Sequence, residues 1–390
     1  MNLTLVLWEH KTFEITRIIL KTYLSYYKNI LHSVVVISSS SKNEVTSHTE
    51  RILEIASEEK IQVEFLYEMQ GSSLLDKASL TETNTTIRSS DIVLFCPGDN
   101  FLAYSENDIN ILNKSDHWYC APRGVRCHLK KDGILSMYQT GIKDKDYTGE
   151  YINSLESSGM GNNASTFWGL FKTKHFLKRM NYLATLNKLI DSSQSIISDS
   201  AIGAICSVTK SFTGESSFEF RMADISEDSS LATKSKITTR KKSRMEVINE
   251  FKAHDKDGLV AIIDNLIKIF IVEAELESNT IKKVRQAVLK SFENYAVSGI
   301  MGAGRIRRDS YNVIVSNKVL KSHFQASLND QSFCNLYIRD DLSIHENILE
   351  RLPPDAVYCS EKFWSDLKLV RSTILPHIIN WNNLNLNNHE

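Results

Sequence analysis

Apolar runs alternate with amphipathic stretches over the first hundred residues of the chain. Four apolar runs, each bounded by polar turns, predict buried strands at residues 3–8 (LTLVLW), 33–38 (SVVVIS), 61–67 (IQVEFLY) and 91–96 (DIVLFC). Apolar positions at helical spacing predict intervening helices at residues 13–30, 44–60 and 73–89. This alternation is typical of βαβ units. It predicts a parallel sheet that is covered on both faces and binds ligands at the carboxyl ends of its strands.

The pattern is mixed from residue 101 to about residue 230. Helices are predicted at residues 175–190 and 198–210 and a strand at residues 216–223, while residues 166–171 (TFWGLF) fit either a strand or the start of a helix. Residues 244–297 have apolar positions at helical spacing, and short strands are predicted at residues 311–316 and 334–340. We therefore predict an α/β fold, with a mixed sheet flanked by helices and a mostly helical C-terminal region.

Three segments follow from this pattern: a first domain over residues 1–232, a basic linker over residues 233–244, and the C-terminal region over residues 245–390. The dense positive charge of residues 234–244 is typical of a solvated hinge. A peripheral contact with anionic lipid, or with a lipid-diphosphate acceptor, is the alternative, at up to ~1 kcal/mol per basic residue. The C-terminal region has three roles open to it, namely docking of partner proteins, self-association as a homo-oligomer, and shaping of an acceptor cleft.

Composition excludes several classes of protein. The chain is 42% hydrophobic and 24% charged with a net charge of -1, which excludes global disorder and gives no support to nucleic-acid binding. The six cysteines are scattered without a C-x-x-C pair, so we expect reduced thiols in a cytoplasmic protein. The N-terminus lacks the pattern of a signal peptide, and no apolar run approaches the roughly 20 residues that span a bilayer.

Polar residues follow the predicted strands at the points where a parallel sheet binds its ligand. The features are Glu9 after the first strand, Ser38 and Ser39 after the second, Lys77 on the third helix, and Gly98-Asp99-Asn100 after the fourth strand. Each also has a structural explanation: P-G-D-N is a strong β-turn tetrad, a serine run often caps a helix, and a helix lysine is often solvated. Neither a G-x-G-x-x-G motif nor a P-loop motif is present.

The order and spacing of these residues resemble bacterial GT-A glycosyltransferases of the family 2-like type, over roughly the first 230 residues. In that family a strand such as residues 91–96 runs into a D-x-D-like cluster, and CPGDNF occupies this place here. The resemblance implies a GT-A (Rossmann-like) domain and a nucleotide-sugar donor contacted by Glu9, Ser38, Ser39, Lys77, Asp99 and Asn100. It also implies Mg²⁺ or Mn²⁺ bound by Asp99. The cluster reads Gly98-Asp99-Asn100, with one carboxylate where the family usually has two or more.

The same resemblance implies a catalytic base. Inverting glycosyl transfer needs a carboxylate that takes the proton of the acceptor hydroxyl, and Asp199 in SIISDSAIGAIC is at the matching position. The alternative is an N-cap, worth about 1 kcal/mol of helix stability. Asn162 and Asn163 are candidates for the acceptor cleft, and Trp168 is a candidate platform for a sugar face, with burial in the core as its alternative.

The sequence thus predicts a cytoplasmic glycosyltransferase that moves a sugar from a nucleoside diphosphate to a glycan or lipid-linked acceptor in surface polysaccharide synthesis. Two alternatives stay open. A nucleotidyltransferase shares such a sheet, although residues 7–13 (LWEHKTF) contain no glycine for its usual phosphate loop. A non-catalytic binding or scaffold protein fits the reduced acidic cluster at Asp99.

Overall fold

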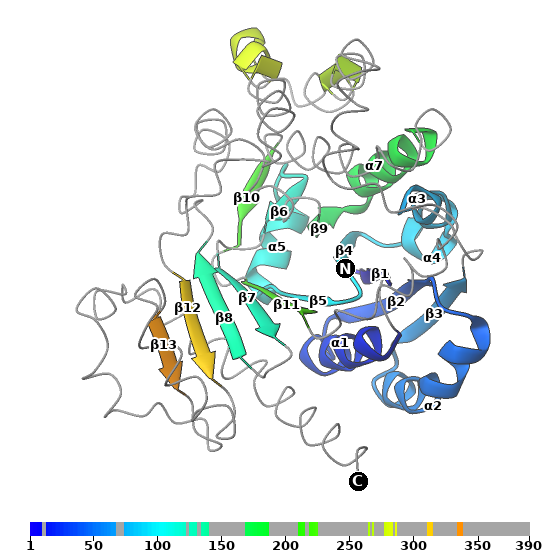
Figure 1. Cartoon of the computed structure of the whole chain (residues 1–390). Helices are drawn as coiled ribbons and strands as arrows, with labels where there is room; N and C mark the ends of the chain where they lie inside the picture. Colours follow the sequence, from blue (N-terminus) through cyan, green and yellow to red (C-terminus); the bar gives the residue numbers. More distant parts are fainter. Residues whose placement is uncertain are drawn as a thin grey trace, which may run out of the picture.

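The computed structural model of the chain contains two β-sheets with helices around the first of them (Figure 1). The described residues are 1–9, 13–67, 74–121, 125–130, 134–139, 168–186, 210–214, 218–224, 264–265, 267–268, 277–283, 285–286, 310–314 and 334–337.

The first sheet has seven strands in the order β10-β6-β9-β4-β1-β2-β3. Its parallel core comprises β1 (Leu3–Trp8), β2 (Leu31–Ser38), β3 (Gln62–Tyr67) and β4 (Ile92–Pro97). Strand β9 (Gly169–Lys172) runs antiparallel to β4, and β6 (Tyr119–Ala121) and β10 (Ser211–Thr213) complete the sheet. The strands β1 and β4 are buried along their whole length, as expected for apolar runs that are covered on both faces.

Helices cover both faces of the parallel core. One face carries α1 (Phe13–Tyr26) and α2 (Lys42–Glu58), which contact each other. The other carries α3 (Leu74–Thr83), α4 (Thr85–Arg88) and α7 (Thr173–Leu186), which are also in mutual contact (Figure 1). Helix α5 (Glu106–Lys114) packs on β6 and β9, and a capping box between Ser105 and Asp108 fixes its start.

The second sheet has six strands in the order β13-β12-β8-β7-β11-β5. They are β5 (Asn100–Ala103), β7 (Val125–Lys130), β8 (Ile134–Gln139), β11 (Phe218–Asp224), β12 (Ser310–Ile314) and β13 (Cys334–Tyr337). Because β4 lies in the first sheet and β5 at the edge of the second, the chain passes between the sheets at Gly98 and Asp99.

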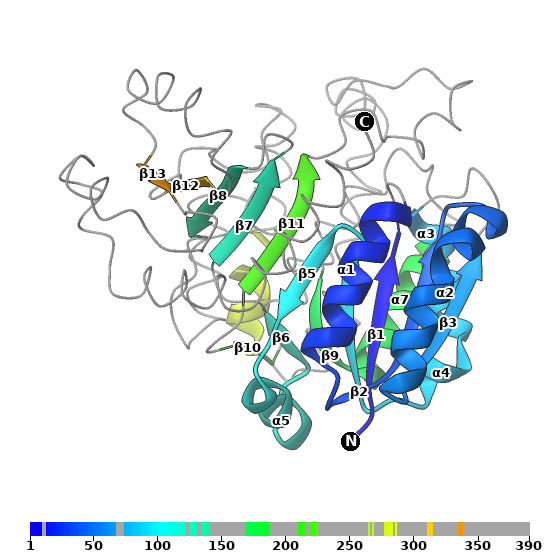
Figure 2. The same cartoon turned by 90° about the horizontal axis from the view of Figure 1, so that it is seen from below.

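Two tyrosine hydroxyls, one from Tyr23 on α1 and one from Tyr27 directly after it, bond to backbone groups on the outer edge of β5, which lies beside α1 in Figure 2. The hydroxyl of Tyr23 accepts a hydrogen bond from Leu102 N–H at 2.8 Å. The hydroxyl of Tyr27 donates to the Leu102 carbonyl at 2.9 Å and accepts from Tyr104 N–H at 2.7 Å. The N–H of Tyr27 donates to the Tyr23 carbonyl at 2.9 Å, so the helical turn continues one residue past α1 and places both rings on one face. Burial raises the pKa of both phenols well above its usual value, so both hydroxyls stay protonated.

The α/β class predicted from the sequence is confirmed, with a mixed sheet flanked by helices. The strands predicted at residues 311–316 and 334–340 correspond to β12 and β13, which join the second sheet through β8. The predicted helix at residues 198–210 lies outside the described residues except for Lys210, and the basic linker lies wholly outside them, so the domain boundaries stay a prediction. Among the described helices, none combines the length and the apolar character that a membrane span requires.

We predict that Tyr27→Phe destabilises the protein by about 1–3 kcal/mol, because it leaves two buried backbone groups of the β5 segment without their partner. The change is measured as the free energy of unfolding in urea. The matched control is Tyr26→Phe, since the half-buried Tyr26 makes no hydrogen bond through its hydroxyl to another described residue. Equal losses in the two variants would contradict the proposed attachment of β5 to α1.

Candidate functional site

The side chain of Glu9 is fully buried at the carboxyl end of β1. Its carboxylate accepts hydrogen bonds from the last residue of β2 and from the loop that follows it. The Ser38 hydroxyl donates to Oε2, and the Ser40 hydroxyl donates to Oε1 at 2.6 Å. The backbone N–H of Ser40 lies 3.4 Å from Oε2. The ends of the two neighbouring strands are therefore joined through one carboxylate.

Helix α3 adds a positive charge to the same place. Lys77 is 3% exposed, and its Nζ donates to the Glu9 carbonyl and, at 2.7 Å, to the Ser39 hydroxyl. The Ser39 hydroxyl in turn donates to the Glu9 carbonyl at 3.0 Å. The structure thus brings together four residues that the sequence singled out. We call Glu9, Ser38, Ser39, Ser40 and Lys77 the carboxyl-edge cluster.

A second contact keeps α3 in place against β1. The indole Nε1 of Trp8 donates to the Thr81 hydroxyl at 2.9 Å, and that hydroxyl donates to the Lys77 carbonyl at 2.7 Å. Thr81 was not among the residues singled out from the sequence, and neither was Ser40. The serine run of residues 38–41 was the signal for Ser40, whereas no sequence pattern indicates Thr81.

The environment of Glu9 raises the pKa of its carboxyl group, chiefly because burial disfavours the charged form. Hydrogen bonds from Ser38 and Ser40 and the charge of Lys77 act in the opposite direction and offset part of this effect. A carboxylate in this position is therefore stabilised by specific partners and not by solvent.

The PGDN segment lies directly beside Glu9. Gly98 N–H donates to the Trp8 carbonyl at 2.8 Å, and Gly98 and Asp99 form the turn between β4 and β5, so the turn interpretation of this tetrad is correct. Asp99 is 1% exposed and Asn100 is also buried. The Asn100 carbonyl accepts from the Cys96 thiol at 3.1 Å. The same turn lies at the sheet edge where ligands bind in such folds, so the two interpretations of Asp99 are compatible.

Only glycine fits at position 98. A Cβ there would lie 2.4 Å from Thr16 Oγ1 on α1 and 3.1 Å from the Glu9 Cα. The turn that carries Asp99 is thus pressed against both α1 and the end of β1.

The remaining predicted residues are not gathered into this cluster. Trp168 is half-buried and packs on core aromatic rings, with centroids 4.6 Å from Phe95 and 6.1 Å from Trp8. Trp168 thus packs against the core, as its alternative explanation predicted. Its role as a platform for a sugar face stays a prediction. Asn162, Asn163 and Asp199 lie outside the described residues. Within the described part of the chain, no three His, Cys, Asp or Glu side chains are close enough to hold a metal ion together.

Comparisons with known proteins give limited information. The sequence matches no protein-family model, and no curated protein matches it. Among solved structures, the chain is similar to the mannosyltransferase PcManGT from Pyrobaculum calidifontis in complex with GDP-Man and Mn2+. The identity is 12%, the match covers 76% of this chain and 87% of that chain, and the TM-score is 0.30. A likeness of this degree supports no argument about function, so the proposals below rest on the residues of this chain.

We predict that Gly98→Ala destabilises the protein by about 1–3 kcal/mol, because the new methyl group overpacks the contact with Thr16. Removing the Thr16 hydroxyl relieves the closest of these contacts, so the double variant Thr16→Ala/Gly98→Ala should lose less than the sum of the two single changes. Urea unfolding of the four proteins of this double-mutant cycle measures the coupling. Additive losses would show that the turn can move away from α1.

A second prediction concerns the pH dependence of stability. The raised pKa means that, above the ordinary value of 4.5, native Glu9 retains a proton that the unfolded chain has lost. The contribution of Glu9 to stability is therefore greatest at low pH and falls as the pH rises through its raised pKa, by up to about 1.4 kcal/mol per pH unit. The measurement is the free energy of unfolding of the wild type minus that of Glu9→Gln, from pH 4.5 upward. The corresponding difference for Glu58→Gln, at the exposed end of α2, is the control. If the difference in unfolding free energy between the wild type and Glu9→Gln rose with pH, it would contradict a raised pKa for Glu9.

Proposed function

We propose that this protein is a glycosyltransferase that moves a sugar from a nucleoside-diphosphate donor to a glycan or lipid-linked acceptor. The observation that carries the proposal is the convergence of the carboxyl-edge cluster with the Gly98-Asp99 turn at the carboxyl ends of β1, β2 and β4. In open α/β sheets this edge is where nucleotides bind.

The carboxyl-edge cluster supports a donor site through its chemistry. A carboxylate with hydroxyl partners can accept hydrogen bonds from a ribose or a nucleobase, and we assign this role to Glu9 with Ser38 and Ser39. Lys77 supplies a positive charge at the same edge for the diphosphate. Lys77 also donates hydrogen bonds to both Glu9 and Ser39. Its second role is therefore to keep the segments that follow β1 and β2 at a fixed separation.

The residues at the end of β4 fit a divalent cation. Mg²⁺ and Mn²⁺ prefer oxygen ligands, and Mg²⁺ is commonly held by one or two carboxylates together with substrate phosphates. Asp99 would supply the carboxylate and Asn100 a neutral amide oxygen. When bound, the cation would neutralise charge on the diphosphate leaving group. The part played by the chain is to hold Asp99 at the sheet edge, which the close packing around Gly98 achieves.

The acceptor side of the proposal follows from the sequence. Asp199 is the proposed general base that takes the proton of the attacking hydroxyl, which fits an inverting reaction. Asn162, Asn163 and Trp168 are the proposed acceptor contacts. We assign the activity to surface polysaccharide synthesis in the cytoplasm, with peripheral membrane contact through residues 234–244 and self-association through the C-terminal region as further elements of the proposal.

One observation favours a second function. Glu9 and Lys77 are 0% and 3% exposed, and the charged groups of both have hydrogen-bond partners within the protein. A binding or scaffold protein that retained the fold without catalysis would be stabilised by such a cluster.

A nucleotide titration separates these two functions. We expect one of UDP, GDP or CMP to raise the melting temperature by several degrees in the presence of Mn²⁺, because a ligand at 100 times its Kd stabilises by about 2.7 kcal/mol. Asp99→Asn should abolish the Mn²⁺-dependent part of this shift. The control Asp91→Asn, at an exposed position before β4, should retain it. A chain that responds to none of the three nucleotides supports the scaffold function instead.

A further inference from the structure

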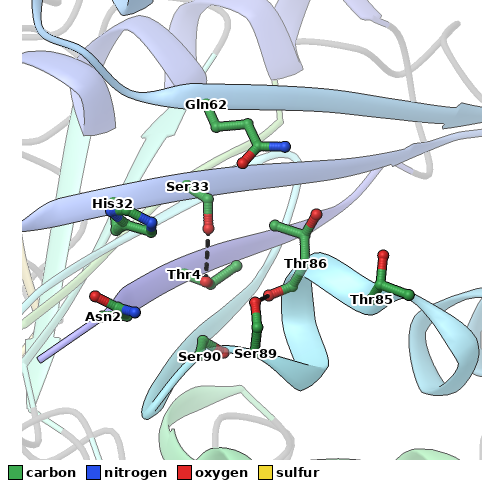
Figure 3. Close-up of a pocket in the computed structure, with 9 residues that line it drawn as sticks. All are labelled: Asn2, Thr4, His32, Ser33, Gln62, Thr85, Thr86, Ser89 and Ser90. Carbon is green, nitrogen blue, oxygen red and sulfur yellow. Dashed lines mark hydrogen bonds between the residues drawn. The ribbon is translucent and has the colours of Figure 1, made fainter.

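A polar pocket of about 300 Å³ lies at the opposite edge of the parallel core (Figure 3). It is lined by Asn2, Thr4, His32, Ser33, Gln62, Thr85, Thr86, Ser89 and Ser90. These residues come from the amino ends of β1, β2 and β3 and from the α4 segment that precedes β4. Four residues of β1 separate Thr4 in this pocket from Glu9, a rise of about 17 Å along the strand. The carboxyl-edge cluster and this pocket are therefore separate sites.

The charge of the pocket limits what it can bind. None of its nine lining residues is Asp, Glu, Lys or Arg, and His32 is the only titratable side chain among them. The pocket therefore offers no carboxylate for a metal ion or an amine, and no permanent positive charge for a phosphate.

Hydrogen bonding within the protein limits the ligand further. The hydroxyl of Thr86 donates to Glu64 Oε2 at 3.0 Å, that of Ser89 to the Thr86 carbonyl at 2.9 Å, and that of Ser90 to the Ile87 carbonyl at 2.6 Å. Since each hydroxyl has one proton, these three have none left to donate. The Ser90 oxygen is engaged further with the Thr173 hydroxyl at 3.2 Å, which leaves Thr86 and Ser89 to present lone pairs to a ligand. An anion, which can only accept hydrogen bonds, gains nothing from them.

The hydroxyls of Thr4 and Ser33, which are buried in the pocket, are also partly committed to a bond within the protein. Thr4 and Ser33 lie 2.7 Å apart and share one hydrogen bond, drawn as a dashed line in Figure 3, so one of the two protons is committed within the pair. By contrast, the side chains of Gln62, His32 and Asn2 are exposed at the rim and make no hydrogen bond with another described residue. The amides of Asn2 and Gln62 can donate and accept at the same time.

We propose that this pocket binds a neutral sugar ring of a glycan. A pyranose has vicinal hydroxyls that donate to the oxygens of Thr86 and Ser89, whose own protons are committed, and accept from the amides of Gln62 and Asn2. A volume of about 300 Å³ is at the small end of the range of ligand pockets, which suits a single ring. The inference does not depend on the proposed transfer of sugar, because no residue of the carboxyl-edge cluster takes part in it.

Ligand-observed saturation-transfer NMR on the full chain tests this inference, with a panel of methyl pyranosides at millimolar concentration as probes. We expect at least one pyranoside to receive saturation from the wild-type protein. Gln62→Ala should weaken its binding roughly three- to tenfold, the factor that one neutral hydrogen bond supplies. The double variant Asn2→Ala/Gln62→Ala should lose detectable pyranoside binding, because both amide donors are removed; both positions are exposed, so folding is expected to be retained.

Two controls isolate the pocket from other sites. Gln286→Ala changes the same residue type at an exposed position that does not line the pocket, and it should bind as the wild type does. Asp99→Asn should also leave pyranoside binding unchanged, which separates this site from the proposed donor site. Three results would overturn the inference: no saturation of any pyranoside, full binding by the double variant, or loss of the pyranoside signal on addition of inorganic phosphate.

Discussion

The passage of the chain from one sheet to the other at Gly98 is the constraint on which the rest of the structure depends. Strand β4 ends in the first sheet and β5 begins in the second, with only Gly98 and Asp99 between them. Gly98 has no room for a side chain against Thr16, and the hydroxyls of Tyr23 and Tyr27 hold the β5 segment on the other side of the turn. Helix α1 therefore fixes both the position of Asp99 and the edge of the second sheet.

The carboxyl-edge cluster offsets part of the cost of burying Glu9, which results from the same packing. With α1, α3 and the PGDN turn closing around the end of β1, Glu9 is removed from water, which disfavours its charged form. Hydroxyl groups from the loop after β2 and the charge of Lys77 compensate for part of that loss. Buried polar clusters of this kind contribute more to a defined geometry than to net stability, because they are favourable only when every partner is in place. A fixed arrangement of a carboxylate, hydroxyls and an ammonium is what recognition of a polar ligand requires.

The sequence predicted the long apolar strands well and the shortest strands poorly, for a physical reason. Strands β1, β2 and β4 are almost wholly buried and therefore appear as continuous apolar runs, whereas the edge strand β3 is only half-buried. Strands β5 and β6 have four and three residues, too few for any periodicity to be recognised. The capping box of Ser105 and Asp108 could have located α5. The meeting of Glu9 with Ser38 and Lys77 was expected from the alternation of strands and helices, which brings strand ends and helix starts to one edge. The packing of Thr16 on Gly98 depends instead on how α1 lies across the sheet.

The two ends of the parallel strands differ in the chemistry that they offer, and this difference bears on how the protein could work. At the carboxyl ends, Glu9, Lys77 and Asp99 place both signs of charge, which suits a charged ligand such as a nucleoside diphosphate. At the amino ends, neutral side chains, several of whose hydroxyl protons are committed within the protein, suit a neutral ligand that brings its own donors. Five residue steps along β1 separate Thr4 from Glu9, so a glycan held at one end would have to span about 17 Å to reach the other. Several linked sugar rings cover that distance, and therefore the two sites would act together only on an oligosaccharide and not on a single sugar.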